Sequence, residues 1–220
     1  MRASLAALTL VTLSVYTVVL NGCGSGRQKP TRLYVLTALP RAENMQQTRA
    51  ADGVAIGVGP VTLPQYVNRP QIVTGDSGPE LQSASFAQWA EPLEDNFARV
   101  LAENLSILLA TDRVAIFPWK GPISINYQVV IEVTRFLGKT GEDASLVALW
   151  SIVGKNGKEV LVSRKSSFNE PTGAQDYEAL AAALSRTVAS LSRDVAAAIT
   201  ALSQKGPDRQ ETAKEERIGN

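Results

Sequence analysis

The sequence predicts an α/β domain in which a single, mostly antiparallel or mixed sheet of six or seven strands carries two amphipathic helices on one face. Three observations predict this fold. Two segments repeat apolar residues every three or four positions, as amphipathic helices do. Short segments rich in β-branched and aromatic residues lie before and between them. An Asn-Gly pair at 156 and 157, typical of a tight β-hairpin, separates two of the later segments.

The predicted strands share a high content of apolar, β-favouring residues. Pro60 and Pro64 are expected to end the second strand, because proline cannot donate a ladder hydrogen bond. The last three strands follow one another closely and are expected to form an antiparallel meander. In chain order the strands are residues 33–37, 54–61, 71–74, 114–117, 125–137, 145–153 and 159–168.

The first predicted helix begins at Glu91-Pro92, with proline at the favoured first position, and ends near Asp112. Its apolar stripe is expected to face the sheet, while charged residues take the other side. The second helix begins between Thr172 and Asp176 and ends before Gly206-Pro207. Its large apolar residues follow one another at steps of three or four: Tyr177, Leu180, Leu184, Val188, Leu191, Val195, Ile199 and Leu202.

The N-terminus is predicted to be a lipoprotein signal peptide, residues 1–22. After Arg2, residues 5–20 carry no charge, yet they fall short of the ~20 residues that a spanning helix needs. Leu20-Asn21-Gly22-Cys23 follows and resembles the bacterial lipobox, in which the cysteine is diacylated and becomes the new N-terminus. Two alternatives are a plain secretory signal with a coincidental cysteine and a retained membrane helix.

An acylated Cys23 would anchor the chain to a membrane without crossing it. Residues 23–32 are then the lipidated cysteine and a tether, whose basic residues either meet anionic headgroups or belong to a solvated linker. Gly24 follows the cysteine. In the sorting rule of such lipoproteins, Asp at this position retains the protein in the inner membrane. The absence of Asp at position 24 favours the periplasmic face of the outer membrane of a Gram-negative bacterium. After the tether we expect an α/β domain at 33–203 and a disordered, charged tail at 204–220.

Composition excludes many kinds of site. The chain has no histidine and one cysteine, which removes Ser-His and Cys-His dyads, internal disulfides and cysteine-based zinc sites. Its 22 basic and 21 acidic residues give a net charge of +1, unsuited to nucleic-acid binding. Gly57-Val58-Gly59 lacks the third glycine of a dinucleotide fingerprint. We therefore predict no catalytic residue, no metal site, and no cofactor apart from the covalent lipid on Cys23.

Two motifs are the most distinctive in the mature chain: Trp89-Ala90-Glu91-Pro92-Leu93, and Tyr66 followed by Arg69-Pro70. Further characteristic segments are residues 33–36, 56–75, 104–106, 118–119 and 177–199. With these features the sequence resembles the PqiC family of ABC-transport auxiliary lipoproteins, part of the paraquat-inducible Pqi system. Asn68 and Gly75 depart from the acidic and basic residues that are common in relatives.

The resemblance implies a non-enzymatic subunit of an intermembrane lipid transport system. In that system an integral inner-membrane transporter subunit and an MCE-domain periplasmic tube cross the periplasm. The lipoprotein docks the far end of the tube at the outer membrane and supports envelope integrity. A tube with rotational symmetry also favours a ring-shaped partner, so a homo-oligomer is expected, with the second helix as one possible seam.

The candidate partner-binding residues are Tyr66, Arg69, Pro70, Trp89, Pro92 and Trp119. Proline-bracketed loops lose little entropy on binding, and Tyr, Trp and Arg dominate interface energies. Alternatively, Trp89 and Pro92 pack the helix start, and Tyr66 fills a turn. Two rival functions also stay open: a free-standing lipid- or ligand-binding lipoprotein, and a purely structural envelope lipoprotein.

Overall fold

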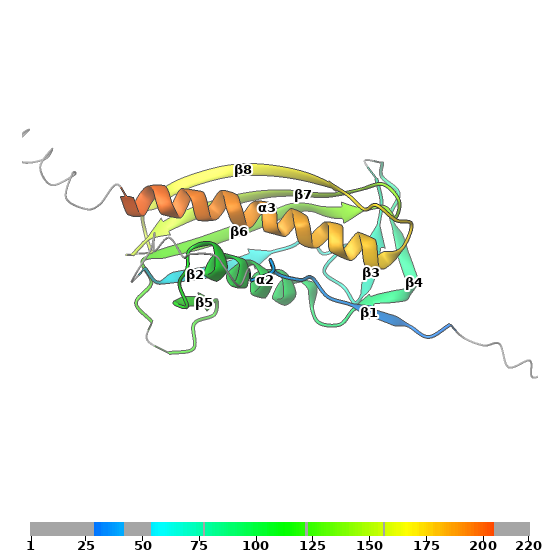
Figure 1. Ribbon diagram of the computed structural model, residues 1–220, viewed down its shortest axis with the longest axis horizontal. Helices are drawn as coiled ribbons and strands as arrows, with labels where there is room; N and C mark the ends of the chain where they lie inside the picture. The colour runs from blue at the N-terminus through cyan, green and yellow to red at the C-terminus, as the bar shows by residue number, and fades with distance from the viewer. Residues whose placement is uncertain (1–28, 42–53, 77, 122, 156, 205–220) are drawn as a thin grey trace, which may run out of the picture. The chain divides into compact units, whose positions relative to one another are not determined.

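The computed structural model in Figure 1 describes residues 29–41, 54–76, 78–121, 123–155 and 157–204. The chain divides into two units, residues 1–30 and 31–220. Nearly all described residues belong to the second unit, which is described by itself. The predicted signal peptide, Cys23, most of the tether, residues 42–53 and nearly all of the predicted charged tail lie outside the described residues.

The strands of the described residues form two mixed sheets, of five and three strands. The larger sheet has the order β5-β2-β6-β7-β8, and the smaller has the order β1-β4-β3. The larger sheet consists of β2 (Ile56–Thr62), β5 (Val114–Ile116), β6 (Tyr127–Gly138), β7 (Asp143–Gly154) and β8 (Val160–Pro171). The smaller sheet consists of β1 (Arg32–Tyr34), β3 (Gln71–Thr74) and β4 (Gln82–Trp89).

The prediction of one sheet with six or seven strands is therefore wrong. The difference arises from β4, which pairs in parallel with β1 and antiparallel with β3 and so removes both from the larger sheet. Its sequence, QSASFAQW, is too polar to stand out as a strand. The sheets adjoin where the Gly75 N–H donates to the Gly138 carbonyl at 3.2 Å, at the ends of β3 and β6.

The predicted antiparallel meander is confirmed: β7 pairs antiparallel with both β6 and β8. Buried residues alternate along β7, where Leu146, Ala148, Trp150 and Ile152 all face the core. Gly157, in the β7–β8 turn, has a φ of +67°, a conformation that glycine adopts without steric cost. Its predicted turn partner, Asn156, lies outside the described residues.

In contrast to the meander, β2 pairs in parallel with β5 on one side and β6 on the other. Pro60 does not end β2 as expected. It lies at a register shift between Val58 and Val61, and such bulges are where a strand tolerates proline. The strand therefore continues to Thr62, and the loop that follows it starts at the far end of β2.

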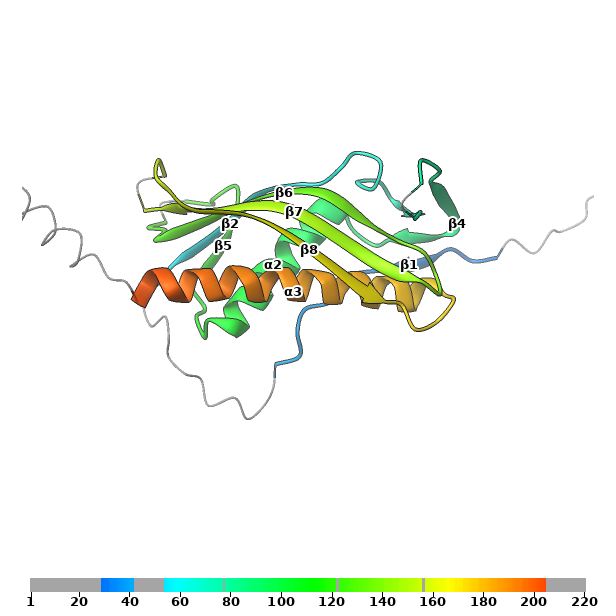
Figure 2. The same ribbon diagram turned by 90° about the horizontal axis from the view of Figure 1, so that it is seen from above.

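The two helices of the described residues are α2 (Leu93–Leu108) and α3 (Tyr177–Gln204), close to their predicted ranges. Both cover the same face of the five-stranded sheet (Figure 2): α2 packs on β2 and β5, α3 on β6 to β8, and the helices pack on each other. Phe97 of α2 meets Phe136 of β6 edge to face, with 5.4 Å between ring centroids. Across the described part of the chain, neither helix has the length and apolar content that crossing a bilayer requires.

Two buried asparagines of α2, two turns apart on the same side, hold the segment that follows β1. The Asn96 Oδ1 accepts from the Leu36 N–H at 2.6 Å. The Asn104 Oδ1 accepts from the Leu39 N–H at 2.7 Å, and its Nδ2 donates to the Ser192 hydroxyl at 3.0 Å. Side chains thus replace the missing strand partners of this segment and fix β1 against both helices.

Candidate functional site

The loop from Pro64 to Pro70 joins β2 of the larger sheet to β3 of the smaller one. Val67 points into the core, and the backbone N–H groups of Val67 and Asn68 both donate to the Pro64 carbonyl, at 3.0 and 3.1 Å. These bonds close a compact turn around a buried anchor. Tyr66, 40% exposed, and Arg69, also exposed, remain on its outside. The turn thus presents both side chains outward.

Glu94, in the first turn of α2, fastens this loop to the helix. One carboxylate oxygen, Oε2, accepts from the Leu63 N–H at 3.2 Å and from the Asn68 side-chain amide at 3.4 Å. The carboxylate also lies at the helix N-terminus, where the helix dipole favours negative charge. Glu94 therefore joins the end of β2, the loop and α2 in one polar cluster.

The loop continues directly into the smaller sheet. The Pro70 carbonyl accepts from the Trp89 N–H at 2.7 Å, which ties the loop to the end of β4. The Arg69 Nε donates to the Gln71 side-chain oxygen at 3.2 Å, and Gln71 lies opposite Gln88 in the β3–β4 ladder. The structure thus brings the two sequence motifs, Tyr66 to Pro70 and Trp89 to Leu93, together.

Trp89 and Pro92 differ in what they offer to a partner. Trp89 is only 6% exposed and packs in the core, facing the same side of the smaller sheet as Tyr34. Pro92 is exposed and occupies the N-cap position of α2 without a side-chain hydrogen bond. In this conformation a partner reaches Tyr66, Arg69, Pro70 and Pro92, but little of Trp89.

The structure places Trp119 apart from this loop, in the connection between β5 and β6. Its ring lies over Gly57: a Cβ at that glycine would be 2.6 Å from Cη2 of Trp119 and 2.7 Å from Cδ1 of Ile125. Phe117 meets the Trp119 ring edge to face at 5.4 Å. Gly57 lies near the start of β2, whereas the Tyr66 loop follows its end. The half-buried Trp119 covers the sheet face opposite the helices.

Sequence reasoning missed an exposed apolar surface on the smaller sheet, formed by Leu33, Val35 and Phe86. Their side chains are 62%, 42% and 45% exposed, respectively. Leu33 pairs with Gln88, two residues after Phe86, so Leu33 and Phe86 are diagonal neighbours on the face of the smaller sheet turned away from the core. Sequence periodicity offers no clear signal for this surface, because Phe86, Ala87 and Trp89 are all apolar and only Gln88 is polar.

A polar depression of about 630 Å³ lies where the ends of β3, β6, β7 and β8 come together. Lys139 and Glu142 form an ion pair on its rim at 2.6 Å, and this contact raises the pKa of Lys139.

At the other end of the larger sheet, burial raises the pKa of the Tyr127 phenol. Among the described residues, no group of three Asp, Glu, Cys or His side chains is placed to hold a metal ion.

A family model described as the ABC-type transport auxiliary lipoprotein component matches residues 34–196. The chain belongs to this family. The match confirms the predicted resemblance to PqiC-like auxiliary lipoproteins and associates the chain with an ABC-type transport system. The family is one of transport components and not a class of enzymes. The matched range contains the loop from Pro64 to Pro70 and almost all residues of both helices and both sheets.

Two solved structures share the fold. Protein XCC0632 from Xanthomonas campestris, a DUF330 family protein, is 18% identical with a TM-score of 0.61, covering 81% of this chain and 99% of that one. An uncharacterized protein is also 18% identical, with a TM-score of 0.63 and coverage of 78% and 99%. At this identity the likeness establishes the architecture alone. No curated protein matches the chain significantly.

Proposed function

We propose that this auxiliary lipoprotein is the outer-membrane subunit of an MCE/Pqi-type intermembrane lipid transport system. It is acylated at Cys23, lies on the periplasmic face of that membrane and docks the MCE-domain tube, whose other end meets the inner-membrane transporter subunit. The observation that carries the proposal is the family match over residues 34–196 in a chain that begins with a lipobox-like segment. The docking role contributes to envelope integrity and requires no catalysis.

The loop from Pro64 to Pro70 is the proposed docking element. Backbone bonds to Pro64, the buried Val67 and the Glu94 carboxylate hold it in one shape before any partner arrives. Binding by such a loop loses little conformational entropy, which favours affinity. Tyr66 and Arg69 supply an exposed aromatic ring and a guanidinium, groups that are enriched among energetically dominant interface residues.

The proposed ring of subunits uses surfaces that the fold leaves free. Two runs of three alanines in α3, at 181–183 and 196–198, each divide in the same way: Ala182 and Ala197 are exposed, whereas Ala181, Ala183, Ala196 and Ala198 pack inside their own subunit. Small exposed residues allow another chain to approach the helix closely. The proposed α3 seam therefore narrows to the exposed face that carries Ala182 and Ala197 together with Arg186 and Arg193.

Charge reversal in the docking loop tests the proposal. We expect Arg69→Glu to reduce recovery of the MCE-domain protein with the tagged lipoprotein about tenfold. At an interface that accommodates a cation, the glutamate sets like charges against each other, which costs free energy, and the exposed position leaves the fold undisturbed. Lys165→Glu is the matched control, because Lys165 is an exposed cation of β8 on the larger sheet. Equal recovery with Arg69→Glu and the control would exclude this loop as the docking element.

A further inference from the structure

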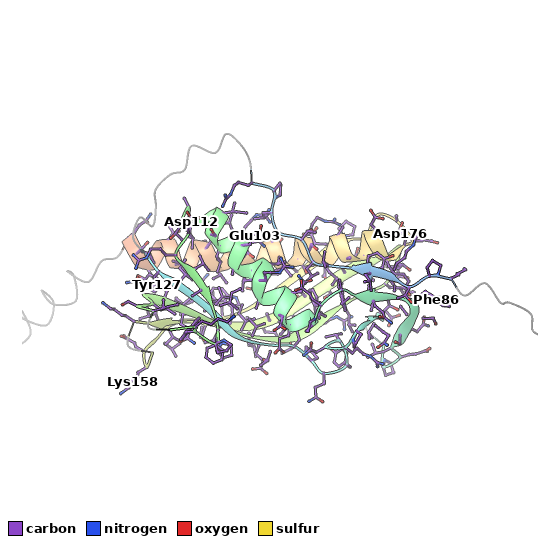
Figure 3. The ribbon with its side chains drawn as sticks, turned by 90° about the horizontal axis from the view of Figure 1, so that it is seen from below. Phe86, Glu103, Asp112, Tyr127, Lys158 and Asp176 are labelled. Carbon is purple, nitrogen blue, oxygen red and sulfur yellow. The ribbon has the colours of Figure 1, made fainter. Side chains whose placement is uncertain are left out.

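The surface formed by Leu33, Val35 and Phe86 has no cover within the described residues. Leu33 and Val35 flank the inward-facing Tyr34, and Figure 3 shows Phe86 at the end of the unit where α3 begins, marked by Asp176. Isolated apolar residues on a protein surface are ordinary, but three neighbouring large ones indicate a contact. Leu149 of β7 differs from these three residues: it is 43% exposed, but its two cross-strand neighbours, Glu132 and Lys165, are charged.

The length of chain before β1 limits what can cover this surface. From Cys23 to Arg32, the start of β1, an extended chain reaches at most about 30 Å. An acyl group on Cys23 thus keeps Leu33 within that distance of the bilayer. No comparable limit applies to the opposite end of the unit, where Tyr127 and Lys158 lie (Figure 3).

The segment that leads from Cys23 into β1 is basic in sequence. Residues 23–32 contain three basic residues and no acidic one: Arg27, Lys29 and Arg32. Basic residues beside a membrane are attracted to anionic headgroups, each contributing about 1 kcal/mol. Phe and Leu side chains next to such cations are typical of surfaces that lie in the headgroup region.

We infer that the outer face of the smaller sheet, through Leu33, Val35 and Phe86, lies against an anionic phospholipid bilayer. The basic tether residues Arg27 and Lys29 are attracted to the same headgroups, and the domain contacts the membrane directly instead of hanging from its tether. The inference rests on the proposed function in one respect, because the acylated Cys23 brings this face to the membrane. The orientation that follows turns the far end of the larger sheet away from the lipid.

Vesicle binding by a chain without its acyl group tests the inference. The mature protein with Cys23→Ser is exported behind a non-lipoprotein signal and mixed with vesicles of phosphatidylethanolamine and phosphatidylglycerol. We expect it to co-sediment with these vesicles, and less with vesicles of phosphatidylcholine alone. Combining Leu33→Ser with Phe86→Ser should lower the partition constant about tenfold, since apolar area is no longer removed from water. Leu149→Ser, the matched control, should bind like the parent.

Two further measurements separate the possible outcomes. The double variant Arg27→Gln with Lys29→Gln leaves the sheet intact and should weaken binding to the anionic vesicles at low salt, with the difference shrinking as salt rises. Sedimentation without lipid shows whether a second copy covers the surface instead. Three results would each overturn the inference. The first is failure of the parent to bind the vesicles, and the second is binding by the Leu33→Ser/Phe86→Ser variant that equals binding by the parent. The third is a change in the oligomeric state of that variant that Leu149→Ser does not share. The proposed function is judged separately, on recovery of the MCE-domain protein with the acylated chain.

Discussion

At the scale of single residues, buried amides do much of the positioning. Asn96 and Asn104 supply hydrogen bonds to a segment that has no strand partner, and their own amides are satisfied in return. Such residues are hard to foresee, because an asparagine within an amphipathic helix is usually exposed. Their role appears only when the segment from Leu36 to Leu39 is placed beside α2.

Asn104→Ala should destabilise the domain by about 1–3 kcal/mol, because it removes the acceptor of the part-buried Leu39 N–H and the donor to the buried Ser192 hydroxyl. Urea unfolding followed by circular dichroism measures the change. The neighbouring Glu103→Ala is the control, since Glu103 is exposed on the same helix. A loss for Asn104→Ala no greater than that of the control would contradict this account of the buried amide.

The candidate site was partly predictable residue by residue. The prolines at 64 and 70 predicted a stiff loop that presents Tyr66 and Arg69, and the structure has both exposed. Trp89 was ambiguous, because tryptophan is common both in interfaces and in cores. Its burial depends on β1, which is distant in sequence, and on α2, which belongs to another layer of the fold. Leu33 and Phe86 were missed for the same reason.

At the scale of elements, local periodicity predicted both helices and the meander, whose residues bond to near neighbours in sequence. The partition into two sheets depends on the parallel pairing of β1 with β4, more than fifty residues later in the chain. No local pattern specifies that partner. The strand order β5-β2-β6 likewise requires contacts across α2 and the β5–β6 connection.

The loop from Pro64 to Pro70 should loosen when its link to α2 is removed. Glu94→Ala deletes the acceptor of the Leu63 and Asn68 bonds, so amide hydrogen exchange should accelerate at residues 63–68 while the core strands keep their protection. The next residue offers a control, because Asp95 is exposed on the same helical turn. Unchanged exchange in Glu94→Ala, or equal acceleration in Asp95→Ala, would show that the carboxylate does not hold the loop.

At the scale of the whole molecule, the α/β unit carries two surfaces with proposed roles, a small sheet that we infer faces lipid and a loop that we propose faces the partner. The proposed lipid anchor, Cys23, precedes this unit in the chain. Fold and family follow from the structure and its comparisons. The anchor and the partner depend instead on covalent processing and on other proteins. Neither is encoded in the packing of this chain.

The unlipidated fragment 24–205 should form a homo-oligomer in solution. A ring-shaped assembly matches the rotational symmetry of the proposed tube, and the exposed face of α3 provides a surface for contact. Analytical ultracentrifugation over a range of concentrations gives the mass directly. A monomer that persists at the highest concentration would argue against the ring.

The most direct test of the proposed function is photo-crosslinking in living cells from a reactive amino acid at position 66, with position 149 of β7 as the comparison. Both native side chains are exposed to a similar extent, 40% at Tyr66 and 43% at Leu149. Tyr66 lies in the loop between β2 and β3, whereas Leu149 lies in β7 of the larger sheet. The account predicts an adduct between the lipoprotein and the MCE-domain protein from position 66 and little from position 149. Absence of that adduct at position 66, or equal yields from the two positions, would contradict it.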